Sequence, residues 1–253
     1  MDLATMRARV REDLQDTDSQ NYRWTDDEVD GAIERVVREF SLAYPLQQQT
    51  DIATTEGSRE IDISSLSKLL KVDSVEFPID ADPRCYQHFG TWDTTLYITD
   101  TGDGSDARLR WGKQHTLLGD TAWVASTAYA LGDIVIPTTN NGFWYECTTA
   151  GTSGASEPTW PTTEGQTVTD GTAVWTCRKS TIPEQFEEII VLGATGYLAT
   201  SASVYTVDRA TIAGKWATIN FLKWGQDRLA RYERKLKAIS RDSRVITREL
   251  YSE

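Results

Sequence analysis

Apolar residues recur every three or four positions over the first 45 residues, which is the spacing of one face of an α-helix. The spacing holds over residues 2–16 and resumes after a polar loop. Thr25 and Glu28 stand three residues apart at this restart and form a capping box, in which each side chain satisfies a backbone N–H of the other. The sequence therefore predicts one helix over 2–16 and a second helix from Thr25 to Pro45, where proline ends it.

From about Thr50 to Leu118 the pattern changes to short stretches in which apolar and polar residues alternate. Gly, Asp and Pro separate these stretches, so we expect the strands of a small sheet. The stretches are REIDIS, KVDSVEFP, TTLYIT and ARLRWG. The acidic segment DTGDGSD, residues 100–106, lies between two of them and fits a hairpin tip better than a calcium loop, because it lacks the spaced terminal glutamate of an EF-hand.

Helical spacing returns after Pro183, which fits the first turn of a helix. Gly193 and Gly196 would let a second helix approach this one closely. A longer helix is predicted over residues 208–240, with one apolar stripe at a period near 3.5 and charged residues on its other faces. Such a stripe is typical of a helix bundle or a subunit interface.

The segment 119–177 differs from its flanks, because it holds four Trp residues and neither Lys nor Arg. Without residues 119–179 the two flanks join into a coherent pattern of helices and strands, so the segment is interpreted as an insertion at an exposed loop. We predict an α+β fold with two domains. Residues 1–118 and 180–253 form a helical-bundle domain with a small β-sheet, and residues 119–179 form an inserted small all-β module.

The inserted module has little core, so its large side chains are needed for packing. Trp123, Tyr129 and Trp175 are therefore assigned to the core of a three-stranded sheet. The pair Gly132 and Asp133 fits a tight turn.

The formal net charge of −12 argues against a general nucleic-acid binder, which needs a basic surface to neutralise phosphates. The charge is uneven along the chain. Residues 1–118 hold 13 basic and 23 acidic residues, whereas residues 208–249 hold 11 basic and 5 acidic ones. An acidic body followed by a basic arm suits a protein that presents different faces to different partners.

The residues available for catalysis or metal binding are few. Cys85 and His88 have the spacing of a ligand pair, but no second pair accompanies them, so a structural role is favoured. Cys147 and Cys177 are interpreted as buried thiols on adjacent strands rather than a disulfide or a metal site. The sequence shows no phosphate loop and no nucleophile elbow, so we expect no enzyme, no cofactor and no metal. An unrecognised hydrolase would rest only on scattered carboxylates.

No apolar run approaches the ~20 residues of a membrane span, and the charged start MDLATMRARVRED has no signal-peptide core. The sequence therefore predicts a protein that neither enters a membrane nor is secreted.

Two stretches, NYRWTDDEVDGAI and VLGATGYLA, carry a resemblance that extends over about residues 1–118 and 180–250. This part of the chain resembles the head-to-tail connector, or adaptor, family of tailed bacteriophages. The resemblance implies a structural virion protein at the neck between capsid and tail, assembled in the host cytoplasm. It also implies a ring, usually of twelve copies, that lies below the portal protein, extends the DNA channel and docks the next connector or tail component.

The charge map adds two expectations to this resemblance. An acidic body would line a channel through which DNA slides without sticking, and the basic arm would dock on an acidic partner such as the portal. The residues assigned to portal docking are Arg241, Arg244 and Arg248. A solvated helix face is the alternative interpretation of this arm.

The inserted module resembles a different family. The segment WVASTAYALGDIV, followed by GFWYECTTAGTSGASEPTWP, is similar to the small aromatic carbohydrate-binding modules of chitinases. The resemblance implies a glycan as ligand, with Trp144, Tyr145 and Trp160 in loops as the residues that stack on sugar rings. Packing of these rings is favoured over sugar contact. The alternative function is accordingly a carbohydrate-binding protein whose helices display the module.

Overall fold

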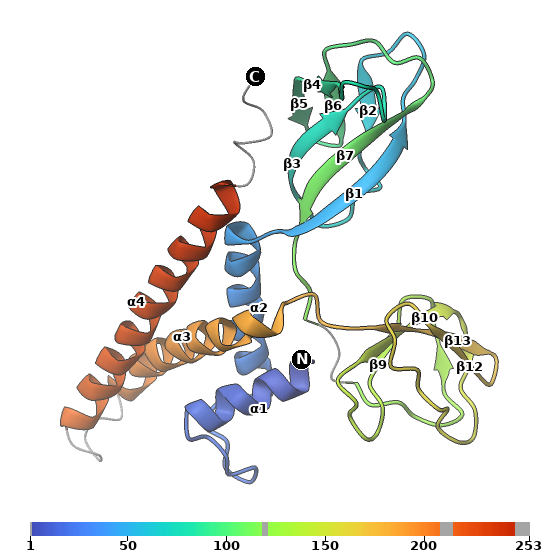
Figure 1. The fold of residues 1–253 in the computed structure, drawn as a ribbon. Helices are drawn as coiled ribbons and strands as arrows, with labels where there is room; N and C mark the ends of the chain where they lie inside the picture. The colour runs from blue at the N-terminus through green and yellow to red at the C-terminus, as the bar shows by residue number, and fades with distance from the viewer. Residues whose placement is uncertain (1, 118–120, 208–214, 246–253) are drawn as a thin grey trace. The chain divides into compact units, whose positions relative to one another are not determined.

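The computed structural model describes residues 2–117, 121–207 and 215–245, and side chains except those of 202–220 and 241–253. Over this part of the chain it forms four α-helices and several small antiparallel sheets, so the expected α+β class is confirmed (Figure 1). The chain has two compact units. Met1–Phe40 and Thr116–Glu253 make up the first unit, and Ser41–His115 make up the second.

The two N-terminal helices begin where the sequence predicts. Helix α1 spans Leu3–Asp13, and the Asp2 side chain caps it by accepting a 2.7 Å hydrogen bond from the backbone N–H of Thr5. Helix α2 spans Asp26–Ala43 directly after Thr25. The capping box is present, because the Thr25 backbone donates to Glu28 Oε2 at 2.8 Å and the Glu28 backbone donates to Thr25 Oγ1 at 3.2 Å.

The C-terminal helices are α3, over Glu187–Val207, and α4, over Lys215–Val245. A short 3-10 turn, Glu184–Phe186, leads into α3. The predicted long helix is thus confirmed from residue 215 onward, and its first residues, 208–214, lie outside the described part of the chain. Over residues 187–201 most side chains of α3 are buried, since the helix packs against both α1 and α4.

Glycines allow the close contacts of α3 that the sequence predicts. A Cβ atom at Gly193 would lie 2.9 Å from both methyl groups of Val36, and one at Gly196 would lie 2.9 Å from the Leu229 side chain. The third close approach comes from α4, where a Cβ at Gly225 would lie 2.9 Å from the Cβ of Ala199. These three positions leave no room for a side chain.

The second unit is a small sandwich of two antiparallel sheets. The first sheet has the order β1-β7-β3-β4 and the second has the order β2-β6-β5. The strand bounds are Leu46–Ala53 (β1), Glu60–Asp62 (β2), Leu69–Glu76 (β3), Tyr86–Gln87 (β4), Phe89–Trp92 (β5), Thr95–Ile98 (β6) and Asp106–Lys113 (β7). The four predicted stretches correspond to β2, β3, β6 and β7. Alternate residues such as Ile61, Leu96 and Leu109 point into the shared core.

Strand β1 was only partly foreseen. In its sequence LQQQTDIA three glutamines follow Leu46 and give no apolar alternation, and the prediction of strands began only at Thr50. The strand nevertheless pairs with β7 over its whole length, from Leu46 opposite Lys113 to Ala53 opposite Asp106. It is an edge strand whose side chains are largely exposed, so backbone pairing rather than burial places it.

The inserted module contains two small antiparallel sheets. Strands β12, β13, β10 and β9 form a four-stranded sheet, and β11 pairs with β8. The bounds are Ala128–Tyr129 (β8), Ile134–Val135 (β9), Trp144–Thr149 (β10), Gly151–Thr152 (β11), Thr167–Asp170 (β12) and Ala173–Arg178 (β13). The expectation of three strands was therefore wrong, because the module has a four-stranded sheet and a second sheet of two short strands. The predicted turn is confirmed, with Gly132 at φ +89°.

The two ends of the inserted module are close together, as an insertion requires. The Thr116 backbone donates to Thr181 Oγ1 at 2.8 Å, just outside the predicted boundaries at 119 and 179. The compact units divide the chain elsewhere, because Ser41–His115 form a unit of their own and the module belongs with the helices. The predicted two-domain division remains a prediction.

Candidate functional site

Over residues 221–240, helix α4 contacts its neighbours along a stripe on one side. Between residues 221 and 240 only Gly225 and Tyr232 are buried, and residues such as Leu229 and Leu236 are half-buried. The Tyr232 hydroxyl donates a 3.3 Å hydrogen bond to the backbone carbonyl of Val36 on α2, and burial raises its pKa. The stripe therefore fixes one side of α4 and leaves the rest exposed.

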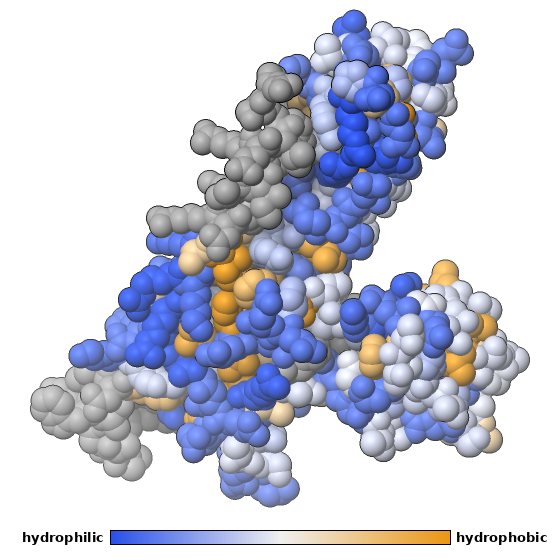
Figure 2. Space-filling view, viewed as in Figure 1, coloured by the Kyte–Doolittle hydropathy of each residue, from blue (hydrophilic) through white to orange (hydrophobic). Residues whose placement is uncertain are grey.

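The exposed side of α4 is strongly basic. The helix contains nine basic and three acidic residues, and Lys223, Arg231, Arg234 and Lys237 are exposed. An α-helix turns by 100° per residue, so these four residues lie on the side of α4 opposite Gly225 and Tyr232. We call them the basic face. Figure 2 shows hydrophobic residues gathered where α4 meets the other helices and hydrophilic residues on its outer side.

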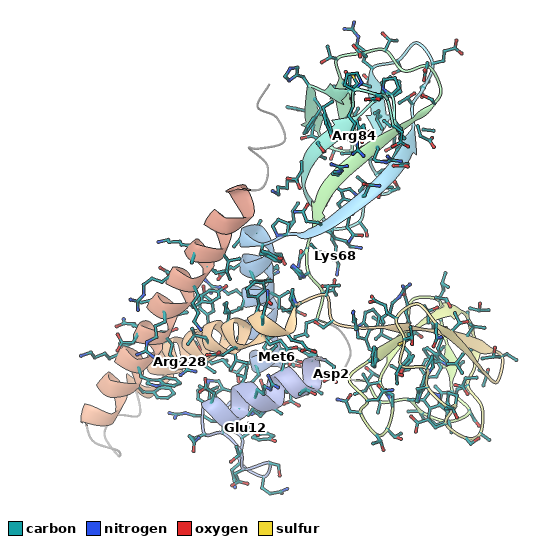
Figure 3. The ribbon with its side chains drawn as sticks, in the orientation of Figure 1. Asp2, Met6, Glu12, Lys68, Arg84 and Arg228 are labelled. Atoms are coloured by element: carbon teal, nitrogen blue, oxygen red, sulfur yellow. The ribbon has the colours of Figure 1, made fainter. Side chains whose placement is uncertain are left out.

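A groove of about 460 Å³ lies among α1, α3 and α4. Its apolar lining comes from Val191 and Leu192, and its charged lining includes Glu12 and Arg228, which are labelled in Figure 3. Arg228 of α4 forms an ion pair with Asp13 of α1, and burial lowers the pKa of this arginine. Because the guanidinium is already neutralised by a carboxylate of the same groove, the groove favours helix packing over capture of an anion.

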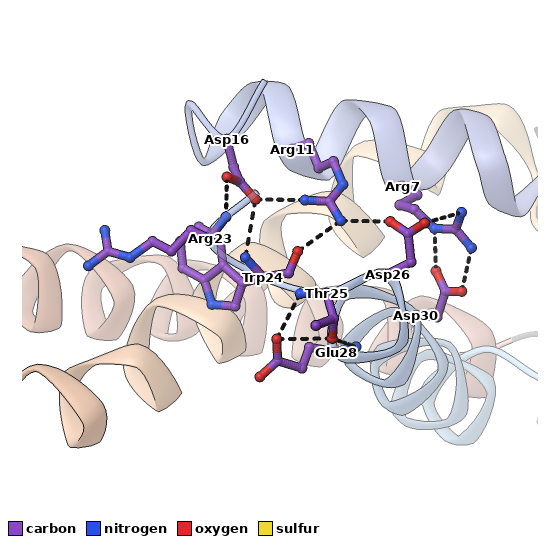
Figure 4. A network of polar contacts seen from close by, with 9 residues as sticks. All are labelled: Arg7, Arg11, Asp16, Arg23, Trp24, Thr25, Asp26, Glu28 and Asp30. Carbon is purple, nitrogen blue, oxygen red and sulfur yellow. Dashed lines mark hydrogen bonds and ion pairs between the residues drawn. The ribbon is translucent and has the colours of Figure 1, made fainter. Parts of the chain in front are cut away.

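Helices α1 and α2 are joined by a network of charged residues (Figure 4). Arg11 donates at 2.6 Å to Asp16 and at 2.6 Å to Asp26, and it also donates to the backbone carbonyl of Trp24 at 2.9 Å. Both Arg11 and Asp16 are buried, with 5% and 7% of their surfaces exposed. Arg7 donates to Asp30 at 2.8 Å beside them. Arginines of α1 and aspartates of α2 and of the intervening loop thus tie the two N-terminal helices together.

The residues predicted to dock on the portal lie at the end of α4 or beyond it. Arg241 and Arg244 fall within the last turns of the helix, and their side chains are outside the described set. Arg248 lies outside the described residues altogether. Their role remains a prediction.

Of the three residues predicted to stack on sugar rings, only Trp160 lies in a loop. Trp144 and Tyr145 are the first residues of strand β10, which corrects their assignment to loops. Tyr145 is fully buried, and its hydroxyl donates to the carbonyl of Pro161 at 2.7 Å. Burial raises the pKa of Tyr145 to about 12. Tyr145 therefore has no exposed ring face to offer a sugar.

The other two aromatic side chains are also largely used in packing within the module. Trp144 is only 7% exposed, and the half-buried Trp160 packs against the Tyr145 ring with centroids 4.2 Å apart. Trp123, Tyr129 and Trp175 lie in the module core, as predicted. Trp160 is thus the one residue of the predicted trio that retains appreciable exposed surface.

The alternative metal sites considered from the sequence receive no support from the described residues, where no group of three or more His, Cys, Asp or Glu is arranged to hold a metal ion. In the segment 100–106, Asp103 accepts from the Ser105 backbone at 2.9 Å, and Gln87 donates to Asp100 at 2.6 Å. His88 is exposed and Cys85 is half-buried on either side of β4.

An exposed aromatic face on the sheet β2-β6-β5 was missed by the sequence reasoning. Trp92 is 78% exposed and Tyr97 is 43% exposed. The signal was present in the stretch TWDTTLYIT, where Leu96 and Ile98 point into the core and Tyr97 must therefore point outward. Glu60 and Asp62 of β2 stand opposite Tyr97 and Thr95 on the same outward face.

No protein-family model and no curated protein sequence matches this chain. Within the described residues, the helices are all too short or too polar to cross a membrane.

Proposed function

We propose that this chain is a structural subunit of a phage head-to-tail connector, which forms a ring below the portal and extends the DNA channel. The observation that carries the proposal is the one-sided packing of α4. The helix is anchored by a single stripe at Gly225 and Tyr232, while its basic face is exposed. A long helix with an exposed charged face supports docking on a partner of opposite charge.

The charge of the rest of the chain agrees with this role. Residues 41–115 hold 12 acidic and 7 basic residues, and residues 1–40 hold 11 acidic and 6 basic ones. A ring lined by acidic surface repels the DNA backbone, so DNA slides through without sequence-specific binding. The partners in this proposal are the portal, the next connector or tail component, and other copies of the chain, twelve in all by the family resemblance.

A glycan-binding function for the inserted module is the second candidate, and its support is weaker. The burial of Tyr145 and Trp144 leaves Trp160 as the main aromatic surface for a sugar. Retention of the purified chain on chitin, lost on Trp160→Ala, would favour this function.

Negative-stain microscopy of the purified protein, alone and mixed with a portal ring, tests the connector proposal. We expect closed rings or a second layer on the portal. Charge reversal of Arg241, Arg244 and Arg248 should abolish the portal complex while the protein stays folded. A protein that joins no ring and no portal assembly would overturn the proposal.

A further inference from the structure

The outer face of the sheet β2-β6-β5 carries aromatic and acidic side chains together. Pairing places Trp92 opposite Thr95 and Gly90 opposite Tyr97, so Trp92 and Tyr97 are diagonal neighbours on one face. Gly90 has no side chain, and a Cβ built there would have nothing within 4 Å, so the position opposite Tyr97 on β5 is open.

Carboxylates border these two rings. Glu60 pairs with Tyr97 and Asp62 pairs with Thr95, and both acidic residues are exposed. The hydrogen bonds that Asp62 accepts from Ser64 lower its pKa, so this carboxylate is charged at neutral pH. Asp93 adds a further acidic group at the turn between β5 and β6, with φ +53°. We call Glu60, Asp62, Trp92, Asp93 and Tyr97 the acidic aromatic face.

A face of this composition binds a basic surface. Arginine and lysine stack on Trp and Tyr rings through cation–π contacts, and they form ion pairs with carboxylates at the rim. The chain uses this contact internally, where the Arg11 guanidinium lies 3.6 Å from the centroid of the Tyr22 ring and that of Arg35 lies 3.8 Å from the centroid of Tyr197. Exposed tryptophan and tyrosine are also the side chains that most often dominate the energy of an interface.

We propose that the acidic aromatic face binds the basic face of α4 on a second copy of this chain. A ring is closed by a heterologous contact, in which one surface of each copy meets a different surface of the next. The acidic aromatic face repels its own copy, so it cannot form a two-fold interface with itself. The basic face, Lys223, Arg231, Arg234 and Lys237, supplies the complementary charge. This inference rests on the proposed ring function and names the contact that forms the ring.

Complementation between two defective variants tests the contact. The first variant, Trp92→Ala with Tyr97→Ala, removes the aromatic rings, and the second, Arg231→Glu with Arg234→Glu, reverses the basic face. All four side chains are exposed, so both variants should keep the circular dichroism spectrum of the native protein. Leu131→Ala, which truncates an apolar side chain with 72% exposure in the module, is the matched control.

Sedimentation velocity over a wide concentration range gives the readout. We expect each variant alone to self-associate at least 10-fold more weakly than the native chain and the Leu131→Ala control. An equimolar mixture of the two variants retains one intact pair of faces, so it should form heterodimers and nothing larger. If the two faces contact each other within one chain, or bind another kind of partner, the mixture would contain no heterodimer.

The outcomes separate this inference from the proposed function. Unimpaired self-association of both variants, or a mixture without heterodimers, overturns the contact and leaves the connector proposal standing. A native chain that remains monomeric at every concentration also overturns the contact, and assembly on the portal then decides the connector proposal separately.

Discussion

The indole N–H of Trp123 donates a 2.7 Å hydrogen bond to Oδ2 of Asp170 in the core of the inserted module. The same carboxylate oxygen accepts from the indole of Trp175 at 3.1 Å, and Oδ1 accepts from the backbone of Gly154 at 2.7 Å. Asp170 is 3% exposed. One buried carboxylate therefore orients two of the module's tryptophans and fixes the loop that precedes Glu157.

Asp170→Ala should destabilise the module by about 3 kcal/mol, because two buried indole N–H groups and the part-buried N–H of Gly154 lose their acceptor at once. Amide hydrogen exchange at β10 and β13 measures this loss locally. The Glu164→Gln variant is the control, since the Glu164 carboxylate lies 3.5 Å from Lys179 in an exposed pair and should contribute less than about 0.5 kcal/mol. Equal protection in both variants would contradict the assigned role of Asp170.

Asp16→Ala should cost about 3 kcal/mol of stability in the helical unit. The substitution leaves the Arg11 guanidinium buried with one carboxylate fewer, and the Arg23 backbone N–H, which donates to Asp16 at 2.7 Å, loses its acceptor. Urea unfolding followed by circular dichroism at 222 nm reports the change. Glu188→Gln is the control, because its 3.6 Å pair with Lys235 involves a carboxylate that is 86% exposed.

The contrast between Thr25 and Asp16 indicates how much the sequence could reveal. The capping box at Thr25 and Glu28 is local, since both partners lie within one turn, so its spacing alone predicted the start of α2. Asp16 joins Arg11 to Arg23 across the loop between two helices. In the sequence, these charges could not be distinguished from a solvated helix face, and only the tertiary fold buries them.

The same reasoning applies to the sheets and to the candidate site. Alternation placed Leu96 and Ile98 inward, because successive side chains of a strand point to opposite faces and the buried face is therefore apolar at every second residue. The glutamines of β1 gave no such signal, since the strand is positioned by backbone pairing with β7. The acidic aromatic face was missed for a related reason. The sequence does not show which strands pair, and only the pairing of β2 with β6 places Glu60 beside Tyr97.

Chemical modification should distinguish the three thiols. Burial raises the pKa of both Cys147 and Cys177, so less reactive thiolate is present at pH 8 and the thiols are also inaccessible. Cys85 is half-buried in the second unit. We expect an Ellman titration of the native protein to detect one fast thiol, which Cys85→Ser removes, and a titration in guanidinium chloride to detect three. Fast reaction of Cys147 or Cys177 in the native state would contradict the packing of the module.

Two glycine-to-alanine substitutions should have opposite effects on stability. In an isolated helix alanine is more stable than glycine by about 1 kcal/mol, because glycine loses more backbone entropy on folding. Gly31 of α2 has nothing within 4 Å of its ideal Cβ position, so Gly31→Ala should stabilise the protein by about 0.5–1 kcal/mol.

At Gly193 the added methyl would lie 2.9 Å from both methyl groups of Val36 and 3.1 Å from the Tyr232 ring. Val36 is fully buried and β-branched, so it cannot move aside by a rotamer change without a clash. Gly193→Ala should therefore destabilise the helical unit by about 1–2 kcal/mol, despite its gain in helix propensity. Urea unfolding of both variants measures the difference directly. Stabilisation by Gly193→Ala would mean that α2, α3 and α4 do not pack as closely as the structure indicates.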